Sequence, residues 1–291
     1  MIANRTDDRT FDELILVDDR RGISALQPHV PPDCCERAAR RLLDRGPGTV
    51  LVVTGFYEIQ PGVIETDGPP GALAIGRALT SLGFETTYVT DRYGLPFIEA
   101  ELTDGTAVVD FPIVGPDESK AFARELLAET KPVAVIAVER CGVTADARYL
   151  NMSGRDLTPY TARTDYLFEG TFTIGIGDGG NEIGMGCVAD VIRDTPRLPD
   201  EPAITTTDEL IICSVSNWGG YGIVAALSRL NGRDLLPSDE DESALISRMA
   251  ENGAVDGHYL VPMAAVDGFT LKENAQVLGT LRRAGTGGDR T

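Results

Sequence analysis

Residues 172–186 read FTIGIGDGGNEIGMG, and this stretch guides the interpretation of the whole chain. Its apolar start, residues 172–176, predicts a short buried strand. The loop that follows places glycines around three polar side chains, Asp178, Asn181 and Glu182. Because glycine lacks a Cβ and tolerates positive φ, such a loop folds tightly and brings its backbone close to a ligand. Open α/β sheets bind ligands at the carboxyl ends of their strands, so we expect a site here; a glycine-rich turn with solvated acids is the alternative.

Outside this stretch, short β-rich apolar runs alternate with amphipathic segments from residue 49 onward, which is typical of βαβ units. The pattern predicts an α/β fold with three αβα layers and a mainly parallel, Rossmann-like sheet. We expect strands at residues 50–54, 86–90, 133–138, 172–176 and 210–215. We expect helices at residues 10–18, 71–82, 118–129, 158–168, 220–230, 240–252 and 271–283. The predicted organisation is an N-terminal helix and loop extension packed on the domain (1–48), one α/β domain (49–284) and a disordered tail (285–291).

The charge is strongly negative, with 45 acidic residues against 26 basic ones and a net charge of −19. Long-range repulsion therefore opposes binding to nucleic acid or to an anionic membrane, and we expect a small-molecule partner. Three of the basic residues are lysines. This composition favours a protein of a high-salt cytoplasm, where salt screens the repulsion among its acidic residues. The alternative is an ordinary acidic protein from a GC-rich genome.

The sequence contains no apolar run of 18 residues and no signal-peptide pattern at its start. We therefore expect a cytoplasmic protein that does not span a membrane. The sequence leaves open whether it forms a homo-oligomer.

The loop at residues 65–72 reads ETDGPPGA and leads into an expected helix. Asp67 is suited to cap that helix, and Pro69 fits its first turn because the amide it lacks would be unpaired there. The functional alternative is that the amides of Gly71 and Ala72 and the positive helix end hold a substrate anion, with Asp67 as a substrate-binding residue beside them. Since two prolines remove donors, a carboxylate suits this position better than a phosphate.

Two more predicted strands run into polar residues. Glu139 and Arg140 follow residues 133–138, and they form either a surface ion pair or a substrate site, because arginine clamps a carboxylate through two parallel hydrogen bonds. Asn217 and Trp218 follow the last predicted strand. The tryptophan is either a core residue or a pocket wall.

Parallel strands bring all of these loops to one edge of the sheet. We therefore expect a single acidic cleft. The convergence of several polar loops is stronger evidence for a site than any one motif. Its members are Glu65, Asp67, Glu139, Arg140, Asp178, Asn181, Glu182 and Asn217.

Four motifs, in this order, are similar to a known family. They are ETDGPPGA at 65–72, Glu139-Arg140 with Tyr149, Asn151 and Met152, GDGGNE at 177–182 with Gly184-Met185-Gly186, and SNWGGY at 216–221. From about residue 49 to residue 268 the chain resembles the D-glutamate cyclase C-terminal-like domain family. The resemblance implies dehydration of D-glutamate to 5-oxo-D-proline, with Asn151 among the substrate-binding residues.

Lactam formation from glutamate requires a free amine, a neutral or polarised γ-carboxyl group and a fixed α-carboxylate. We expect Asp178 and Glu182 to move protons, Glu65 or Glu139 to bind the ammonium group, and Arg140 to bind a carboxylate. Clustered acids raise one another's pKa, so one acid stays protonated while its neighbour acts as a base.

Other assignments remain open at this point. As an alternative to proton transfer, Asp178 and Glu182 would bind Mg²⁺ or Mn²⁺, because carboxylate and amide oxygens suit hard cations. The residues do not by themselves require a cofactor. The cleft also fits a non-catalytic protein that binds an amino acid or nucleotide. A third alternative is a metal-dependent enzyme acting on a phosphorylated metabolite, against which the scarcity of lysine argues.

Overall fold

The computed structural model describes residues 9–103 and 105–286. Its centre is a parallel sheet of six strands in the spatial order β5-β4-β1-β6-β7-β8. The strands are β1 (Thr49–Thr54), β4 (Glu85–Thr90), β5 (Ala107–Asp110), β6 (Ala134–Val138), β7 (Phe172–Gly177) and β8 (Glu209–Ile212). Along the chain, the sheet begins near its middle with β1 and extends to one side through β4 and β5. It then extends to the other side through β6, β7 and β8, which is the strand order of a Rossmann sheet. The predicted α/β class and parallel sheet are confirmed.

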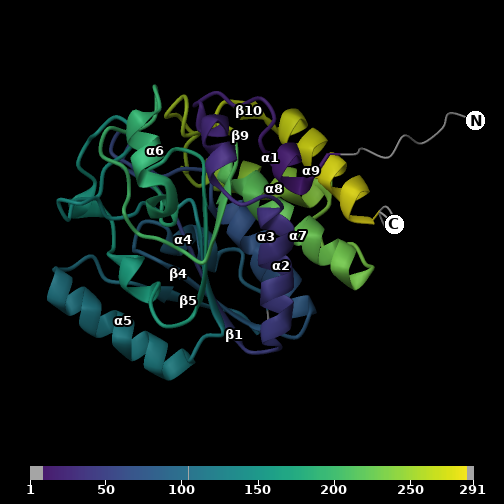
Figure 1. Cartoon of the computed structure of the whole chain (residues 1–291), viewed down its shortest axis with the longest axis horizontal. Helices are drawn as coiled ribbons and strands as arrows, with labels where there is room; N and C mark the ends of the chain where they lie inside the picture. Colours follow the sequence, from purple (N-terminus) through teal and green to yellow (C-terminus); the bar gives the residue numbers. More distant parts are fainter. Residues whose placement is uncertain (1–8, 104, 287–291) are drawn as a thin grey trace, which may run out of the picture.

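Helices cover both faces of the sheet (Figure 1). They are α1 (Phe11–Ile15), α2 (Cys34–Arg45), α3 (Pro69–Ser81), α4 (Leu95–Glu99), α5 (Pro116–Thr130), α6 (Ala189–Asp194), α7 (Ser216–Asn231), α8 (Asp239–Glu251) and α9 (Leu271–Thr286). Two antiparallel hairpins complete the fold, formed by β2 (Tyr57–Glu58) with β3 (Val63–Ile64) and by β9 (Ala265–Val266) with β10 (Phe269–Thr270). Short 3₁₀ segments are η1 (Ile23–His29), η2 (Thr158–Tyr160), η3 (Thr164–Leu167) and η4 (Met185–Val188).

Successive side chains of a strand point to opposite faces of the sheet, so each strand contributes to two cores. Val50 and Val52 of β1 belong to a core shared with α2, α3, α7 and α9, whereas Leu51 and Val53 belong to a core on the α5 face. Both sets are fully buried because parallel strands in the middle of such a sheet have helices on each side. No helix of the described ranges is both long and apolar enough to cross a bilayer.

The N-terminal stretch takes part in the first of these cores. Phe11 and Ile15 of α1, together with Cys35 and Leu42 of α2, are buried there. Of the segments predicted at the two chain ends, residues 1–8 and 287–291 lie outside the described ranges. Gly285 and Thr286 form the end of α9.

One predicted helix is wrong. Residues 158–168 form η2 and η3 instead of an α-helix, and Thr161 between them is extended. Ala162 is held there by tertiary hydrogen bonds, since its amide donates to Asp91 and its carbonyl accepts from Arg140. These bonds replace the local hydrogen bonds that a helix would need.

Other boundaries also differ from the predictions. The last sheet strand ends at Ile212, and α7 begins at Ser216, so the residues expected as a loop at 216–219 form the first turn of a helix. The edge strand β5 was missed, since its residues are half-buried or exposed and show little apolar pattern. Helices α2, α4 and α6 were missed as well.

The register of the sheet aligns the starts of the site loops. Thr54 at the end of β1 lies beside Val138 at the end of β6, and Val138 lies beside Ile176 in β7. The three following segments, from Gly55, Glu139 and Gly177, therefore leave the same edge next to one another. This edge contains the point where the strand order reverses, between β1 and β6.

Candidate functional site

The glycine-rich loop after β7 folds around Glu182. Its carboxylate accepts hydrogen bonds from the amides of Asp178 (3.2 Å), Gly179 (2.6 Å) and Gly180 (2.8 Å). Gly180 has φ +93°, and a Cβ at Gly179 would lie 2.8 Å from Glu182 Oε1, so the glycines make this cradle possible. Glu182 thus organises the loop through three backbone donors, an arrangement that suits an anchored anion better than the predicted proton carrier.

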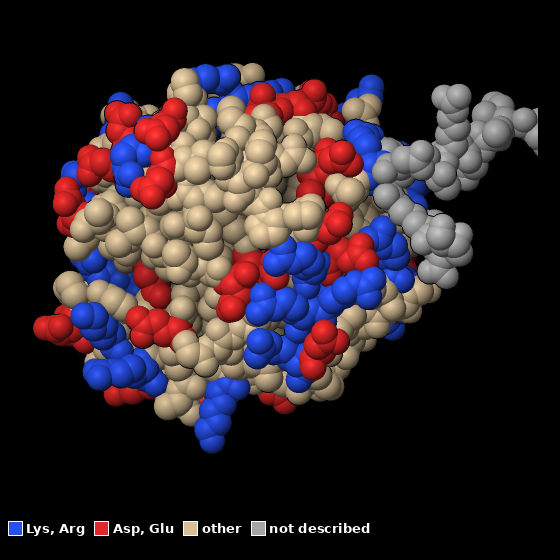
Figure 2. Space-filling model, in the orientation of Figure 1, with Lys and Arg blue, Asp and Glu red and all other residues tan. Residues whose placement is uncertain are grey.

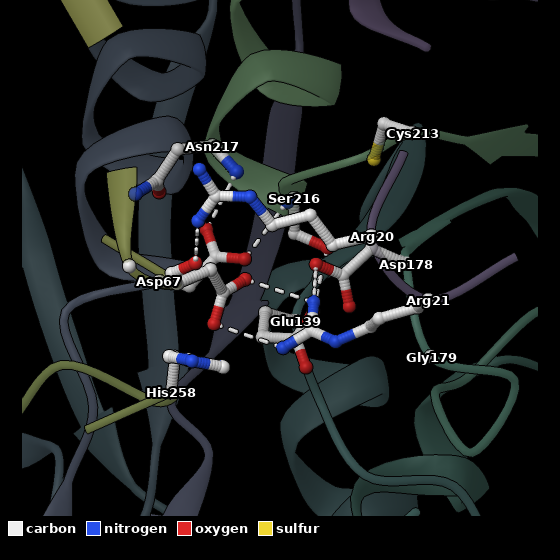
Figure 3. A network of polar contacts seen from close by, with 12 residues as sticks. Arg20, Arg21, Asp67, Glu139, Asp178, Gly179, Cys213, Ser216, Asn217 and His258 are labelled. Atoms are coloured by element: carbon white, nitrogen blue, oxygen red, sulfur yellow. Dashed lines mark hydrogen bonds and ion pairs between the residues drawn. The ribbon is translucent and has the colours of Figure 1, made fainter. Parts of the chain in front are cut away.

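Asp178 points from the same loop toward Arg21 (Figure 3) and lies close to Asp267, and the sequence suggested neither of these two partners. Arg21 makes an ion pair with Asp178 and donates from both terminal nitrogens to Asp267, at 2.8 Å each. Carboxylate oxygens of Asp67, Asp178 and Asp267 lie within 4.8 Å of one another. The ion pairs join the carboxyl edge of the sheet to the β9–β10 hairpin and to the N-terminal segment.

The turn of the β9–β10 hairpin presents Asp267. Its two loop residues, Asp267 and Gly268, both have positive φ, +51° and +76°, as a type I′ turn requires. An Asp-Gly pair between apolar residues is a sequence signal for this turn, so Asp267 was detectable as a turn residue. Arg21 carries no such signal, because it stands in a polar stretch next to Arg20.

Asp67 and Asn217 cap each other's helices. Asp67 accepts from the amides of Ser216 and Asn217 at the start of α7, at 2.8 Å each. Asn217 in turn accepts from the amides of Gly68 (3.0 Å) and Gly71 (2.8 Å) at the start of α3. The capping role considered for Asp67 is therefore present, but on a helix far along the chain and not on the one that follows it.

The helix end considered for a substrate anion is filled by protein atoms. The amide of Gly71 binds Asn217, and the amide of Ala72 binds the carbonyl of Gly68 at 2.9 Å. Trp218 is 1% exposed, donates to Asn274 at 2.7 Å and packs on Phe269, so it is a core residue. These positions leave Gly71, Ala72, Asn217 and Trp218 behind the cavity wall.

Arg140 is also placed away from the cavity. It is 1% exposed, and its guanidinium donates to Asp91 (2.6 Å), to the Gly55 carbonyl (2.7 Å) and to the Ala162 carbonyl (3.1 Å). Arg140 does not line the cavity, and these internal acceptors bind both of its terminal nitrogens. The expected carboxylate clamp at Arg140 is corrected to a buried structural ion pair.

Glu139, directly after β6, and Glu65, directly after β3 of the small hairpin, both line the site. Glu139 has φ +45°, an unfavourable backbone conformation for a glutamate, and it accepts from the Ser216 hydroxyl at 2.6 Å. Glu65 lies between β3 and α3 and is 4% exposed. Gly257 makes room for it, because a Cβ there would lie 1.9 Å from Glu65 Oε2.

These side chains border a cavity of about 320 Å³. Six predicted site residues line it: Glu65, Glu139, Asn151, Asp178, Asn181 and Glu182. The other predicted site residues do not line the cavity: Asp67, Gly71, Ala72, Arg140, Asn217 and Trp218. The lining also includes polar residues that the sequence did not suggest, among them Arg21, Glu58, Gln60, Arg155 and His258.

A larger hollow, of about 520 Å³, lies at the opposite edge of the sheet, near the starts of β6 and β7. Arg41 and Arg45 border it, within a group of arginines on α2 that Figure 2 shows as a blue area. Arg41 is paired with Glu209 and lies over the ring of Phe172. This charge belongs to internal pairs, and ligands of such sheets bind at the other edge, so we assign the site to the smaller cavity.

Burial dominates the electrostatics of the cavity. Removal from water raises the pKa of Glu65, Glu139 and Asp178 well above the ordinary values, and neighbouring acids add to the effect. Burial and Asp267 raise the pKa of Glu58 to about 7. Asp267 differs, since the effect of its burial is outweighed by Arg21, and its pKa is lowered. The acid cluster therefore combines groups with a raised pKa, at Glu65, Glu139 and Asp178, with Asp267, whose pKa is lowered beside Arg21.

Two groups of three acids bring oxygens within 4.8 Å of one another: Asp67, Asp178 and Asp267, and Glu139, Asp178 and Glu182. Carboxylate sets of this kind suit Mg²⁺ or Mn²⁺. In this arrangement, however, Arg21 neutralises Asp178 and Asp267, and three amides hold Glu182. A metal ion would have to displace these internal donors.

Comparison with known proteins identifies the relatives of this chain. The human mitochondrial D-glutamate cyclase is 32% identical over 200 residues, which cover 62% of this chain and 32% of that protein. The chain thus matches about a third of the length of this relative. The family described as D-glutamate cyclase-like, C-terminal, matches residues 11–282, including the N-terminal segment that carries Arg21. The chain belongs to this D-glutamate cyclase-like C-terminal family.

Proposed function

We propose that the protein is a D-glutamate cyclase-like lyase that dehydrates D-glutamate to 5-oxo-D-proline. The observation that carries the proposal is a cavity lined by the buried acids Glu65, Glu139 and Asp178 and by Arg21, which forms an ion pair with Asp267. Intramolecular lactam formation needs a proton donor and a proton acceptor within one small site. Family membership and the human relative's name support the choice of substrate.

The reaction assigns distinct tasks to the acids. Asp178 takes a proton from the substrate ammonium group, and its raised pKa makes it a stronger base than an ordinary aspartate. The free amine attacks the γ-carboxyl carbon, forming the C–N bond. The γ-carboxyl group reacts in its neutral form, and protonated Glu139, held by Ser216, gives its proton to the departing hydroxyl group as the C–O bond breaks, so that water leaves. The Glu139 carboxylate then takes the second proton from the lactam nitrogen, and Asp178 returns its proton to solvent. Glu65 binds the substrate ammonium group on its way into the site.

The substrate's α-carboxylate requires a cation that Arg140 does not supply. Arg155 lines the cavity at its exposed rim, and its charge acts on Glu58. Asn151 fixes the turn that carries it, since Asn151 Oδ1 accepts from the amides of Ser153 and Arg155 at 3.0 Å each. We assign the α-carboxylate to Arg155, with the γ-carboxyl group directed toward the buried acids.

The test is incubation of the protein with D-glutamate and, separately, L-glutamate in high salt, followed by chiral detection of 5-oxoproline. Parallel samples contain Mg²⁺, Mn²⁺ or EDTA. We expect 5-oxo-D-proline from D-glutamate in the EDTA sample. Tight binding of D-glutamate without product under every condition would instead identify a binding protein, and product only with added metal would overturn the metal-free mechanism.

A further inference from the structure

Arg21 reaches the acid cluster from a short segment that we call the strap, residues 18–24. Asp19 shapes the strap by accepting from the amides of Arg21 (2.9 Å), Gly22 (2.7 Å) and Ser24 (2.9 Å). Asp18 and Gly22 have positive φ, +54° and +93°. This tight turn fixes the direction of the Arg21 side chain before it meets the acids.

The strap is also fastened to the β9–β10 hairpin. Arg20 lies over the ring of Phe269, 3.5 Å from its centre, and donates to the Asp267 carbonyl at 3.2 Å. Arg21 then grips the Asp267 carboxylate with both terminal nitrogens and contacts Asp178 at the end of β7. Its side chain is 26% exposed and lines the cavity, whereas Asp178 and Asp267 are 2% and 5% exposed.

We propose that Arg21 is a positioning residue, which holds Asp178 and Asp267 together as an ion-paired cluster beside the cavity that Glu65 and Glu139 line. The assignment of these roles to the reaction rests on the proposed function. The contacts themselves do not, because they are made within the protein.

Electrostatics explain why one cation has this influence. The groups that face Arg21 or its two partners come from every element around the cavity: Arg20, Glu58, Glu65, Asp67, Glu139, Asp178, Glu182, Cys213 and His258, with Asp267 at the centre. Two carboxylates in contact repel strongly in a buried site unless a cation or a proton lies between them. Without Arg21, Asp178 and Asp267 would compete with Glu65 and Glu139 for the same protons.

The first experiment does not depend on any substrate. Side-chain carboxyl groups of aspartate are labelled with ¹³C, the Asp267 and Asp178 signals are assigned with D267N and D178N, and their titration is followed by NMR in wild type and in Arg21→Met. We expect the Asp267 midpoint to move to higher pH in R21M and to return most of the way in Arg21→Lys. Unchanged midpoints in folded R21M would overturn the proposal.

The second experiment measures turnover of D-glutamate against pH. We expect kcat of R21M to fall by about 100-fold, with the acidic limb of the profile moved to higher pH, because a carboxylate that has lost its cation ionises later. Asp19→Ala keeps the arginine but loosens the strap, so we expect a smaller loss in the same direction. Arg37→Met, which removes a cation from buried Glu209 at the other sheet edge, is the matched control and should behave as wild type.

The outcomes separate the two proposals. An inactive wild-type protein refutes the proposed function, while the NMR titration still decides the role of Arg21. An active wild type with a normal pH profile in R21M refutes the role of Arg21 alone. If R21M fails to fold by circular dichroism, R21K and D19A give the decision, because each retains a cation or the arginine itself.

Discussion

Two arginine–aspartate centres lie close to the same strand ends, and they are used differently. At one, Arg140 and Asp91 are 1% and 3% exposed and are surrounded by backbone carbonyls and amides. At the other, Arg21 contacts Asp178 and Asp267 while part of its side chain borders the cavity. The comparison teaches that an arginine buried with an aspartate and main-chain carbonyls, away from the cavity, supports the fold, whereas an arginine paired with carboxylates at the cavity wall is placed to control charge in the site.

The largest expected effect is on stability, at the first centre. Arg140→Met leaves Asp91 buried without its partner, and removal of one member of a buried pair costs about 3–5 kcal/mol. Chemical denaturation should show this loss, with a smaller one for R21M, since Asp178 and Asp267 have neighbours with which to share a proton. A fully stable R140M protein that fails to bind D-glutamate would restore Arg140 as a substrate ligand.

Next in size is the loss of a proton donor at the second centre. Glu139→Gln keeps the size of the side chain and its contact with Ser216 but has no proton to give. We expect kcat to fall by about 100-fold with little change in the melting temperature. Glu118→Gln on α5, on the opposite face of the sheet, serves as the control. Wild-type turnover in E139Q would remove Glu139 from the chemistry.

A smaller effect is expected at the rim. Arg155→Met should raise KM for D-glutamate about tenfold, which corresponds to about 1.4 kcal/mol, and leave kcat nearly unchanged. The α-carboxamide analogue of D-glutamate lacks the charge that Arg155 is assigned to bind, so its KM should change little. Equal increases for both compounds would mean that Arg155 shapes the rim without recognising the carboxylate.

The smallest expected effect is in the pH dependence of stability. The pKa of Glu58 is raised to about 7 in the folded protein, so the folded state binds more protons than the unfolded state between pH 4.5 and 7. Its contribution therefore makes the free energy of unfolding fall as pH rises through this window. Glu58→Gln should make that fall shallower in denaturation series at pH 5, 6 and 7. An identical slope in E58Q would indicate that Glu58 ionises alike in both states.

The sheet and the position of the site could be predicted because they depend on local patterns. Apolar runs mark the middle strands, and the parallel arrangement gathers the loops after them, so Glu65, Glu139, Asp178 and Glu182 were found together. Arg140 was misassigned because it adjoins Glu139 in the sequence, whereas the chain turns at Glu139, which has φ +45°. Thus Glu139 reaches the cavity while Arg140 reaches Asp91.

The remaining site residues depend on contacts that no local pattern encodes. Arg21 meets Asp178 across 157 positions and Asp267 across 246. Asp67 caps a helix that begins 149 positions later. Each of these residues has an ordinary local interpretation as surface charge or as the cap of the next helix, and only the assembled fold selects the distant partner.

The long reach of the Arg21–Asp267 pair has a consequence for the order in which the molecule folds. Loop closure over 246 positions is slow and is favourable only after the sheet and its helices have brought the two segments together. Until that moment the acids at the carboxyl edge lack their cation. The strap is therefore expected to dock late. A probe of the Arg21 contacts should report refolding later than a probe of core packing.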